Sequence, residues 1–329
     1  MTSERTRRPR SKVRPLAFMV ALGVLAVAVL PLPAGAATRS LPPVDDHESA
    51  TADWLRAIGF EPATTTAEST ASTSTTTITG ITAVSLVITD EARGRTMAVT
   101  VKAPTTGGPY PLVVLVHGYA ASAADYDTLT DALAWAGFVV AAPDFPRSSR
   151  TATSAPERDY HDQAADVSYV IDRLTDGVTA PDLTARIDRS AIAVAGHSDG
   201  GITAAGVAFN SEVADPRIGA AVVMSGAAFG FSGSWFAADP QPALLVLHGT
   251  ADSVNPIGAS QSMFAQAEGA KTLVEVTGGS HAGPFTTDAT VPAVAQVIAD
   301  FLHRTFTPSA AADARLIADA SAAPLFIAG

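Results

Sequence analysis

Residues 191–209 read AIAVAGHSDGGITAAGVAF and carry the strongest structural signal in the chain. The run begins as a short apolar strand and ends as a helix over residues 202–209. Between them, Ser198 stands two positions from a glycine on either side. A sharp strand-to-helix turn needs these glycines, because a Cβ there would collide with the neighbouring strand or helix. The stretch therefore predicts a nucleophile elbow with Ser198 at its tip, and the alternative is a structural turn before a helix.

Short apolar strands and helical patterns alternate on both sides of this elbow. The expected strands are residues 83–89, 97–102, 111–116, 138–142, 191–195, 218–224, 243–247 and 272–276. Further helices are expected over residues 126–135, 161–174 and 291–302. Strands separated by helical crossovers predict an α/β fold, in which a mostly parallel central sheet has helices on both faces. We expect one domain over residues 78–306, without a large lid, because residues 225–242 are too few to form one.

A serine nucleophile needs an acid and then a histidine base, in that chain order, at the carboxyl ends of later strands. Asp252 follows the strand over residues 243–247, and His281 follows the strand over residues 272–276. We therefore predict a catalytic triad of Ser198, Asp252 and His281.

Other residues could fill the same roles. His248 and His303 are the remaining histidines after the elbow, and His303 lies on the expected closing helix. His248 immediately precedes the acid loop, which favours a supporting role over that of the base. Asp252 could be an ordinary turn aspartate, and Asp239 is then the reserve acid.

Acyl transfer also needs two backbone amides that stabilise the developing oxyanion. One comes from the residue after the nucleophile, which is Asp199. The other comes from a loop after an earlier strand, where His117-Gly118-Tyr119 follows residues 111–116. We predict that the amides of Tyr119 and Asp199 form the oxyanion hole, that His117 is structural, and that the Tyr119 ring is a wall of the acyl pocket.

Several motifs together resemble the α/β-hydrolase superfamily across residues 78–306. The resemblance is to its secreted cutinase-like polyester hydrolases, which are related to platelet-activating-factor acetylhydrolases and dienelactone hydrolases. The motifs that carry it are HGY (117–119), AWAGFVV (134–140), GHSDGG (196–201), ADSVNP (251–256) and GGSH (278–281). The resemblance implies a serine esterase with the same triad, which acts on a small-molecule or polymeric ester and needs no metal or organic cofactor.

Two positions depart from the pattern of polyester hydrolases. Those enzymes commonly carry Met after the serine, where this chain has Asp199, and Trp on a later loop, where it has Ala228 or Phe229. We take Phe229 as the candidate pocket residue. The Asp199 carboxylate either faces the pocket, which would disfavour very apolar acyl groups, or turns away to bond a neighbouring loop.

The N-terminus has the pattern of a secretory signal peptide. Six basic residues lie within the first fourteen positions, and residues 16–30 form an uncharged, largely apolar run before Pro31. We predict a signal peptide over residues 1–36, export by the general secretory route and an extracellular protein. A twin-arginine signal and a retained anchor are the alternatives, and a location on the cell wall is left open. Residues 37–77 are then an N-terminal extension with a Thr/Ser-rich linker, and residues 307–329 an alanine-rich tail.

Composition excludes several other functions. The net charge of −11 opposes binding to nucleic acid. The chain has no cysteine, which excludes disulfides, thiolate metal sites and a cysteine nucleophile. We expect a monomer without a stable membrane anchor. The second function hypothesis is a catalytically inactive, exported binding protein with the same fold.

Overall fold

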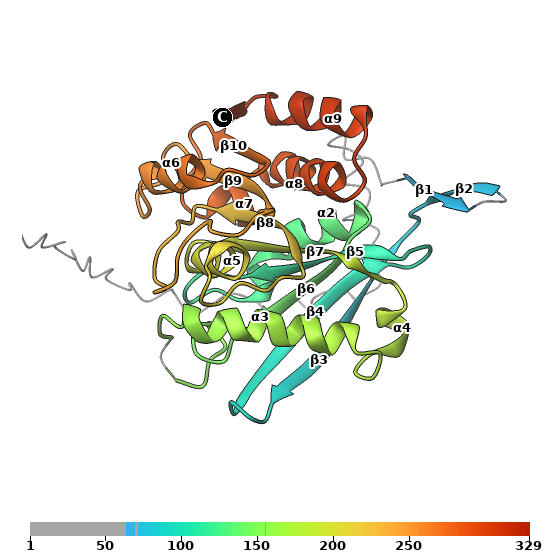
Figure 1. Ribbon diagram of the computed structural model, residues 1–329, viewed down its shortest axis with the longest axis horizontal. Helices are drawn as coiled ribbons and strands as arrows, with labels where there is room; N and C mark the ends of the chain where they lie inside the picture. Colours follow the sequence, from blue (N-terminus) through green and yellow to red (C-terminus); the bar gives the residue numbers. More distant parts are fainter. Residues whose placement is uncertain (1–63, 70–71, 155) are drawn as a thin grey trace, which may run out of the picture. The chain divides into compact units, whose positions relative to one another are not determined.

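The structure is a computed structural model that describes residues 64–69, 72–154 and 156–329 (Figure 1). Its strands are β1 (Thr64–Ser69), β2 (Ser72–Thr77), β3 (Ile81–Asp90), β4 (Arg95–Pro104), β5 (Tyr110–Val116), β6 (Val139–Asp144), β7 (Ile187–His197), β8 (Ile218–Met224), β9 (Ala243–Gly249), β10 (Lys271–Val276) and β11 (Leu325–Ile327). Its helices are the 3₁₀ helix η1 (Ala123–Tyr126), α2 (Asp127–Trp135), α3 (Tyr160–Thr175), α4 (Pro181–Thr184), α5 (Asp199–Phe209), α6 (Ile257–Gln266), α7 (Gly283–Thr286), α8 (Val291–Phe306) and α9 (Ala310–Ala320).

The described strands from β3 onward form a nine-stranded sheet in the order β11-β10-β9-β8-β7-β5-β6-β4-β3. The six strands from β10 to β6 in this order are parallel, while β3, β4 and β11 pair antiparallel. Val116 of β5 pairs with Gly196 of β7, so the two strands end side by side. The loops that follow the parallel strands therefore meet at one edge of the sheet, where α/β proteins place their sites.

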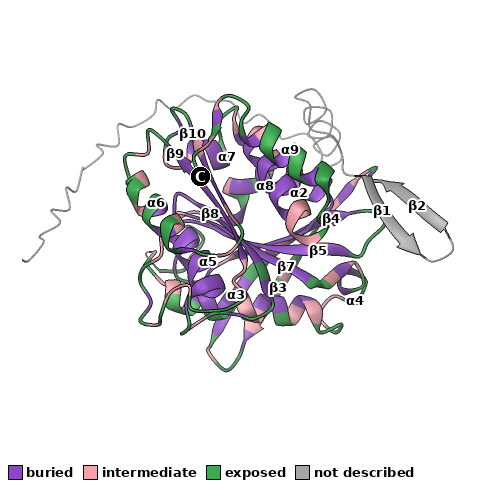
Figure 2. Ribbon diagram, turned by 45° about the horizontal axis from the view of Figure 1, so that its top comes forward, coloured by how far each residue is buried: buried purple, intermediate pink, exposed green. Residues whose placement is uncertain are grey.

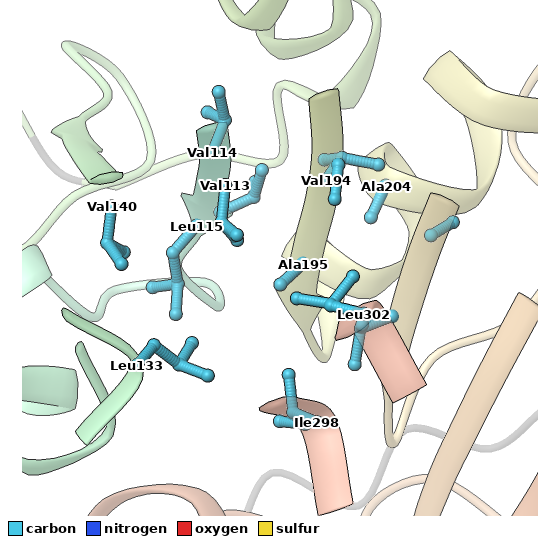
Figure 3. Packing of buried hydrophobic residues seen from close by; sticks show 14 of the residues in the cluster. Val113, Val114, Leu115, Leu133, Val140, Val194, Ala195, Ala204, Ile298 and Leu302 are labelled. Carbon is cyan, nitrogen blue, oxygen red and sulfur yellow. The ribbon is translucent and has the colours of Figure 1, made fainter. Parts of the chain in front are cut away.

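Helices cover both faces of this sheet, as predicted from the alternating pattern. Figure 2 shows α2, α8 and α9 on one side and α3 and α5 on the other. Successive strand residues point to opposite faces. Figure 3 shows this in β7, where Val194 lies near Ala204 of α5, and Ala195 lies towards Leu302 of α8. All four side chains are fully buried, which explains why residues 191–195 of β7 form a continuous apolar run.

The expected strands and helices are present, and their ends differ from the predictions by a few residues. No range was expected for α6, because only Ser260 and Met263 of this helix are buried and its apolar periodicity is therefore weak. Residues 225–242, between β8 and β9, contain no helix and are all described.

The C-terminal segment corrects a prediction. Residues 307–329 were expected to be a tail outside the domain, but α9 packs on α8 and β11 pairs antiparallel with β10. Leu316 of α9 and Leu325 of β11 are buried. The alanine-rich composition did not indicate this helix, because only a few large apolar residues dock it on the domain. The domain therefore includes α9 and β11.

Of the predicted N-terminal segments, the structure describes only residues 64–69 and 72–77. The signal peptide over residues 1–36 lies outside the described residues, as does most of the extension over residues 37–77. Within the Thr/Ser-rich linker, β1 and β2 form an antiparallel hairpin that belongs to a separate two-stranded sheet. Over the described part of the chain, none of the helices combines the length and apolar character that a membrane span requires.

The docking of α9 can be tested with two adjacent residues. Leu316 is 2% exposed and Ile317 is 61% exposed. Leu316→Ala should lower the free energy of unfolding by about 2–5 kcal/mol, because it leaves a cavity against the domain. Ile317→Ala, the control, should change it by less than about 0.5 kcal/mol. Chemical denaturation measures both values, and equal effects of the two substitutions would mean that α9 is not docked.

Candidate active site

Ser198 occupies a strained turn between β7 and α5. Its backbone has φ 57° and ψ −121°, a conformation that a residue with a side chain rarely adopts. The Ser198 amide donates to the Met224 carbonyl of the adjacent β8 (2.9 Å), which fixes the turn to the sheet. This is the geometry of a nucleophile elbow, in which the serine side chain is lifted out of the strand direction.

The two flanking glycines are required by close backbone contacts. A methyl group on Gly196 would lie 2.0 Å from the Gly200 carbonyl oxygen. A methyl group on Gly200 would lie 2.2 Å from the carbonyl oxygen of Val116 in β5. Neither contact can be relieved by rotating a side chain, because both partners are backbone atoms. The spacing seen in the sequence thus follows from how tightly α5 begins against β5 and β7.

The three predicted triad residues form one hydrogen-bonded chain. His281 Nε2 lies 2.9 Å from Ser198 Oγ, and His281 Nδ1 lies 2.8 Å from Asp252 Oδ2. The three residues follow β7, β9 and β10, whose parallel arrangement brings their loops to the same edge of the sheet. Because a carboxylate can only accept hydrogen bonds, the N–H at His281 Nδ1 donates a hydrogen bond to Asp252, and Nε2 faces the serine.

Asp252 is built to remain ionised. The amides of Val254 and Asn255 donate to its Oδ1 (2.8 and 2.9 Å), and His281 donates to its Oδ2. Burial opposes ionisation, but these hydrogen bonds outweigh it and hold the pKa of the carboxyl below its ordinary value. The side chain is 1% exposed, so it orients His281 in a largely water-excluded setting.

His248 supports the acid loop rather than facing the serine. Its Nε2 lies 3.0 Å from the Asn255 carbonyl oxygen and 3.2 Å from Asp252 Oδ2, and its Nδ1 lies 2.8 Å from Ser260 Oγ. The other candidate, His303 on α8, lies 2.9 Å from the carbonyl oxygen of Ala136 at the end of α2. The geometry therefore favours His281 among the histidines considered from the sequence. Asp239, the reserve acid, precedes a cis-proline in the loop before β9.

The loop after β5 lies against the elbow. A methyl group on Gly118 would be 3.3 Å from Ser198 Cβ. The Gly118 carbonyl accepts from His117 Nδ1 (2.8 Å) and from the Ala121 amide (3.1 Å), and His117 Nε2 accepts from the Phe145 amide. In a trans peptide the N–H points opposite to the carbonyl, so the Tyr119 N–H points away from His117.

The two predicted oxyanion donors lack acceptors within the described chain. Neither the Tyr119 amide nor the Asp199 amide donates to a described residue. Asp199 is also the first residue of α5, where the helix leaves its amides unpaired. Both amides are thus available for an oxygen bound beside Ser198, which is what an oxyanion hole requires.

The Asp199 side chain bonds a neighbouring loop, which is one of the two arrangements considered from the sequence. Its Oδ1 lies 2.8 Å from Arg158 Nη1, while its Oδ2 is buried without a described partner. Burial raises the pKa of the carboxyl, and the charges of Arg158 and His281 oppose this rise. Arg158 could not be predicted from the sequence, because it stands 41 positions from Asp199 in a loop without periodicity.

The two predicted pocket residues are both half exposed, Tyr119 at 46% and Phe229 at 48%. The Arg158 guanidinium lies over the Tyr119 ring, 5.7 Å from its centroid, and the Tyr119 hydroxyl donates to the Pro156 carbonyl. Phe229 packs edge-on against Tyr160 at the start of α3, with 6.2 Å between ring centroids. Tyr119 thus lies against Arg158, the partner of Asp199, whereas Phe229 packs against α3.

The described residues contain no group of three or more His, Asp or Glu side chains arranged to hold a metal ion. The side chains linked to Ser198 are the imidazole of His281 and, through it, the carboxylate of Asp252. Their arrangement can perform nucleophilic acyl transfer.

The close contacts of Gly200 at the elbow can be tested by measuring stability. Gly200→Ala should lower the free energy of unfolding by more than about 2 kcal/mol, because the new methyl group must displace the backbone of β5. Gly258→Ala is the matched control: Gly258 is an exposed position in α6 with open space around it, and alanine should stabilise the helix by up to about 1 kcal/mol. Thermal or chemical unfolding measures both, and a Gly200→Ala protein of full stability would contradict the described packing.

Comparison with known proteins supports the fold assignment independently of this geometry. A family model described as Chlorophyllase matches residues 70–227. The match includes the HGY loop and the elbow with Ser198, and it ends before Asp252 and His281. A search of curated proteins gave no match. Taken together, the mostly parallel sheet with its helices and this match over part of the chain show the α/β-hydrolase fold.

Proposed function

We propose that this protein is an exported serine hydrolase that cleaves carboxylic esters through an acyl-enzyme intermediate. The observation that carries the proposal is the hydrogen-bonded chain from Asp252 through His281 to Ser198, at the tip of a strained elbow. A serine hydroxyl is a weak nucleophile at neutral pH, and an adjacent base in this arrangement is what activates it.

The reaction has two stages. In the first, Ser198 Oγ attacks the ester carbonyl while His281 Nε2 takes its proton, and His281 then returns that proton to the leaving alcohol. In the second, water attacks the acyl-enzyme with the same histidine as base, which releases the acid and restores Ser198. Asp252 keeps the imidazole in the tautomer whose Nε2 can accept a proton, and it stabilises the imidazolium that forms.

The amides of Tyr119 and Asp199 would bind the oxyanion in both stages. Because they are held by the backbone before substrate arrives, they need little reorganisation when charge develops on the carbonyl oxygen. The Asp199 carboxylate does not alter this donor directly, since the donor is a backbone group. Its pairing with Arg158 reduces the negative charge beside the oxyanion.

The surroundings of the site favour short or polymeric esters. Residues 225–242 form no helical cover, and the rings of Tyr119 and Phe229 are half exposed. A site without a helical cover can accept an extended or polymeric ester as in cutinase-like enzymes, while the ionic pair of Asp199 and Arg158 would disfavour very apolar acyl groups close to the serine.

Export is part of the proposal and rests on the sequence of residues 1–36, with their basic start and apolar run. A catalytically inactive, exported binding protein is the competing hypothesis. It would not need three catalytic groups within hydrogen-bond distance of each other, and their geometry therefore favours the enzyme.

Ser198→Ala tests the proposed enzyme. Without the hydroxyl, kcat for p-nitrophenyl esters from acetate to palmitate, and release of acid from a polyester film, should fall by at least about a thousandfold. Ser232→Ala, an exposed serine after β8, is the control and should retain wild-type kcat. Ser198→Ala turnover within tenfold of wild type, in a protein that unfolds at the wild-type temperature, would refute the role of Ser198. Wild-type protein inactive on every ester would favour the binding hypothesis.

A further inference from the structure

A buried hydrogen-bonded chain runs behind the nucleophile and joins the two loops that carry the base and the oxyanion donor. The His281 carbonyl oxygen lies 2.8 Å from His197 Nε2. His197 Nδ1 lies 2.8 Å from the Tyr126 hydroxyl, and that hydroxyl lies 3.2 Å from the Gly118 amide. Tyr126 is the last residue of η1, and His197 immediately precedes Ser198. The proposed catalytic steps use neither side chain.

The donors and acceptors of this chain can be assigned without ambiguity. A carbonyl oxygen only accepts, so His197 Nε2 carries the proton. Burial lowers the pKa of His197 to about 4, so the ring is neutral at pH 7 and its Nδ1 is an acceptor. The Tyr126 O–H therefore donates to Nδ1, and its oxygen accepts from the Gly118 N–H. Each link requires the protonation state that its neighbour provides.

The side chains of this hydrogen-bonded chain, Tyr126 and His197, are also confined by packing. Tyr126 is 1% exposed and His197 is 4% exposed. The His197 ring lies between the His281 ring and the Phe285 ring, with centroid separations of 4.8 and 5.2 Å. His197 therefore contacts the base loop through both its ring face and its Nε2 proton. Small shifts of either loop would break hydrogen bonds that water cannot readily replace.

We propose that Tyr126 and His197 are positioning residues that hold the His281 loop and the Gly118–Tyr119 loop in register across Ser198. The inference rests on the proposed function, because it assigns these two residues a role in that reaction. They touch neither the substrate nor the attacking oxygen.

Loss of the Tyr126 hydroxyl would slow the reaction by displacing the Tyr119 amide, the proposed oxyanion donor. Tyr119 directly follows Gly118, whose carbonyl is held by His117 and whose amide donates to Tyr126. Without the Tyr126 hydroxyl, the Gly118 amide has no other described acceptor. The peptide group between His117 and Gly118 should therefore rotate until its N–H finds another acceptor. Such a turn would move the Tyr119 N–H away from the oxyanion, and errors of about 1 Å in a catalytic group can cost a hundredfold in rate.

Tyr126→Phe tests the proposal, with Tyr110→Phe as its matched control. Both tyrosines are 1% exposed, and the Tyr110 hydroxyl donates to the Thr106 carbonyl near the opposite end of β5 (2.5 Å). In Tyr126→Phe, kcat for p-nitrophenyl acetate should fall by about 10- to 100-fold while KM changes by less than about threefold. The affinity for an alkylboronic acid, which forms a tetrahedral adduct with the serine, should fall by a similar factor. Tyr110→Phe should lower the melting temperature without changing kcat or boronate affinity.

Two substitutions of His197 test the links separately and replace Tyr126→Phe if that protein does not fold. His197→Gln can keep the donor to His281, and His197→Asn can keep an acceptor for Tyr126. Each breaks one link, so each should lower kcat and boronate affinity while KM stays within threefold. Wild-type kcat in Tyr126→Phe, or in either His197 variant, overturns the proposal. If Ser198→Ala stays active, the proposed function fails. If Ser198→Ala is inactive and Tyr126→Phe has full kcat, only the positioning role fails.

Discussion

The backbone of Ser198 lies in a left-handed conformation because β7 must turn directly into α5 while β5 passes within contact distance. That turn can be made only if Gly196 and Gly200 have no side chain, and it is held by the hydrogen bond from the Ser198 amide to β8. The loop after β5 also lies against the elbow, at Gly118. One local constraint thus sets the position of the Ser198 hydroxyl, of the first amides of α5 and of the neighbouring loop at Gly118.

Around this turn, several buried polar groups have a defined donor or acceptor. Asp252 receives two backbone amides and His281, His117 holds the Gly118 carbonyl, and Tyr126 with His197 holds the Gly118 amide. Such networks are costly to leave half satisfied, so they fix loops that the fold alone would leave adaptable.

The sequence was sufficient for the features that have local patterns. The alternation of strands and helices predicted the sheet, and the elbow predicted where β7 ends and α5 begins. The chain order of Ser198, Asp252 and His281 predicted residues that the structure brings together. The roles of Arg158 and Tyr126 were not predicted, because each pairs with a residue that is distant in sequence. The tail was misread because α9 docks through few large side chains, so its composition resembled that of an exposed segment.

A covalent acyl group on Ser198 is the species that the proposed mechanism cannot do without. Rapid mixing of the protein with a p-nitrophenyl ester, followed by acid quench, digestion and peptide mass spectrometry, would detect it. The mechanism predicts an added acyl mass on the peptide that contains Ser198, formed and lost at rates compatible with turnover. Ester turnover with no such adduct when deacylation limits the rate, or with the acyl group on another residue, would contradict it.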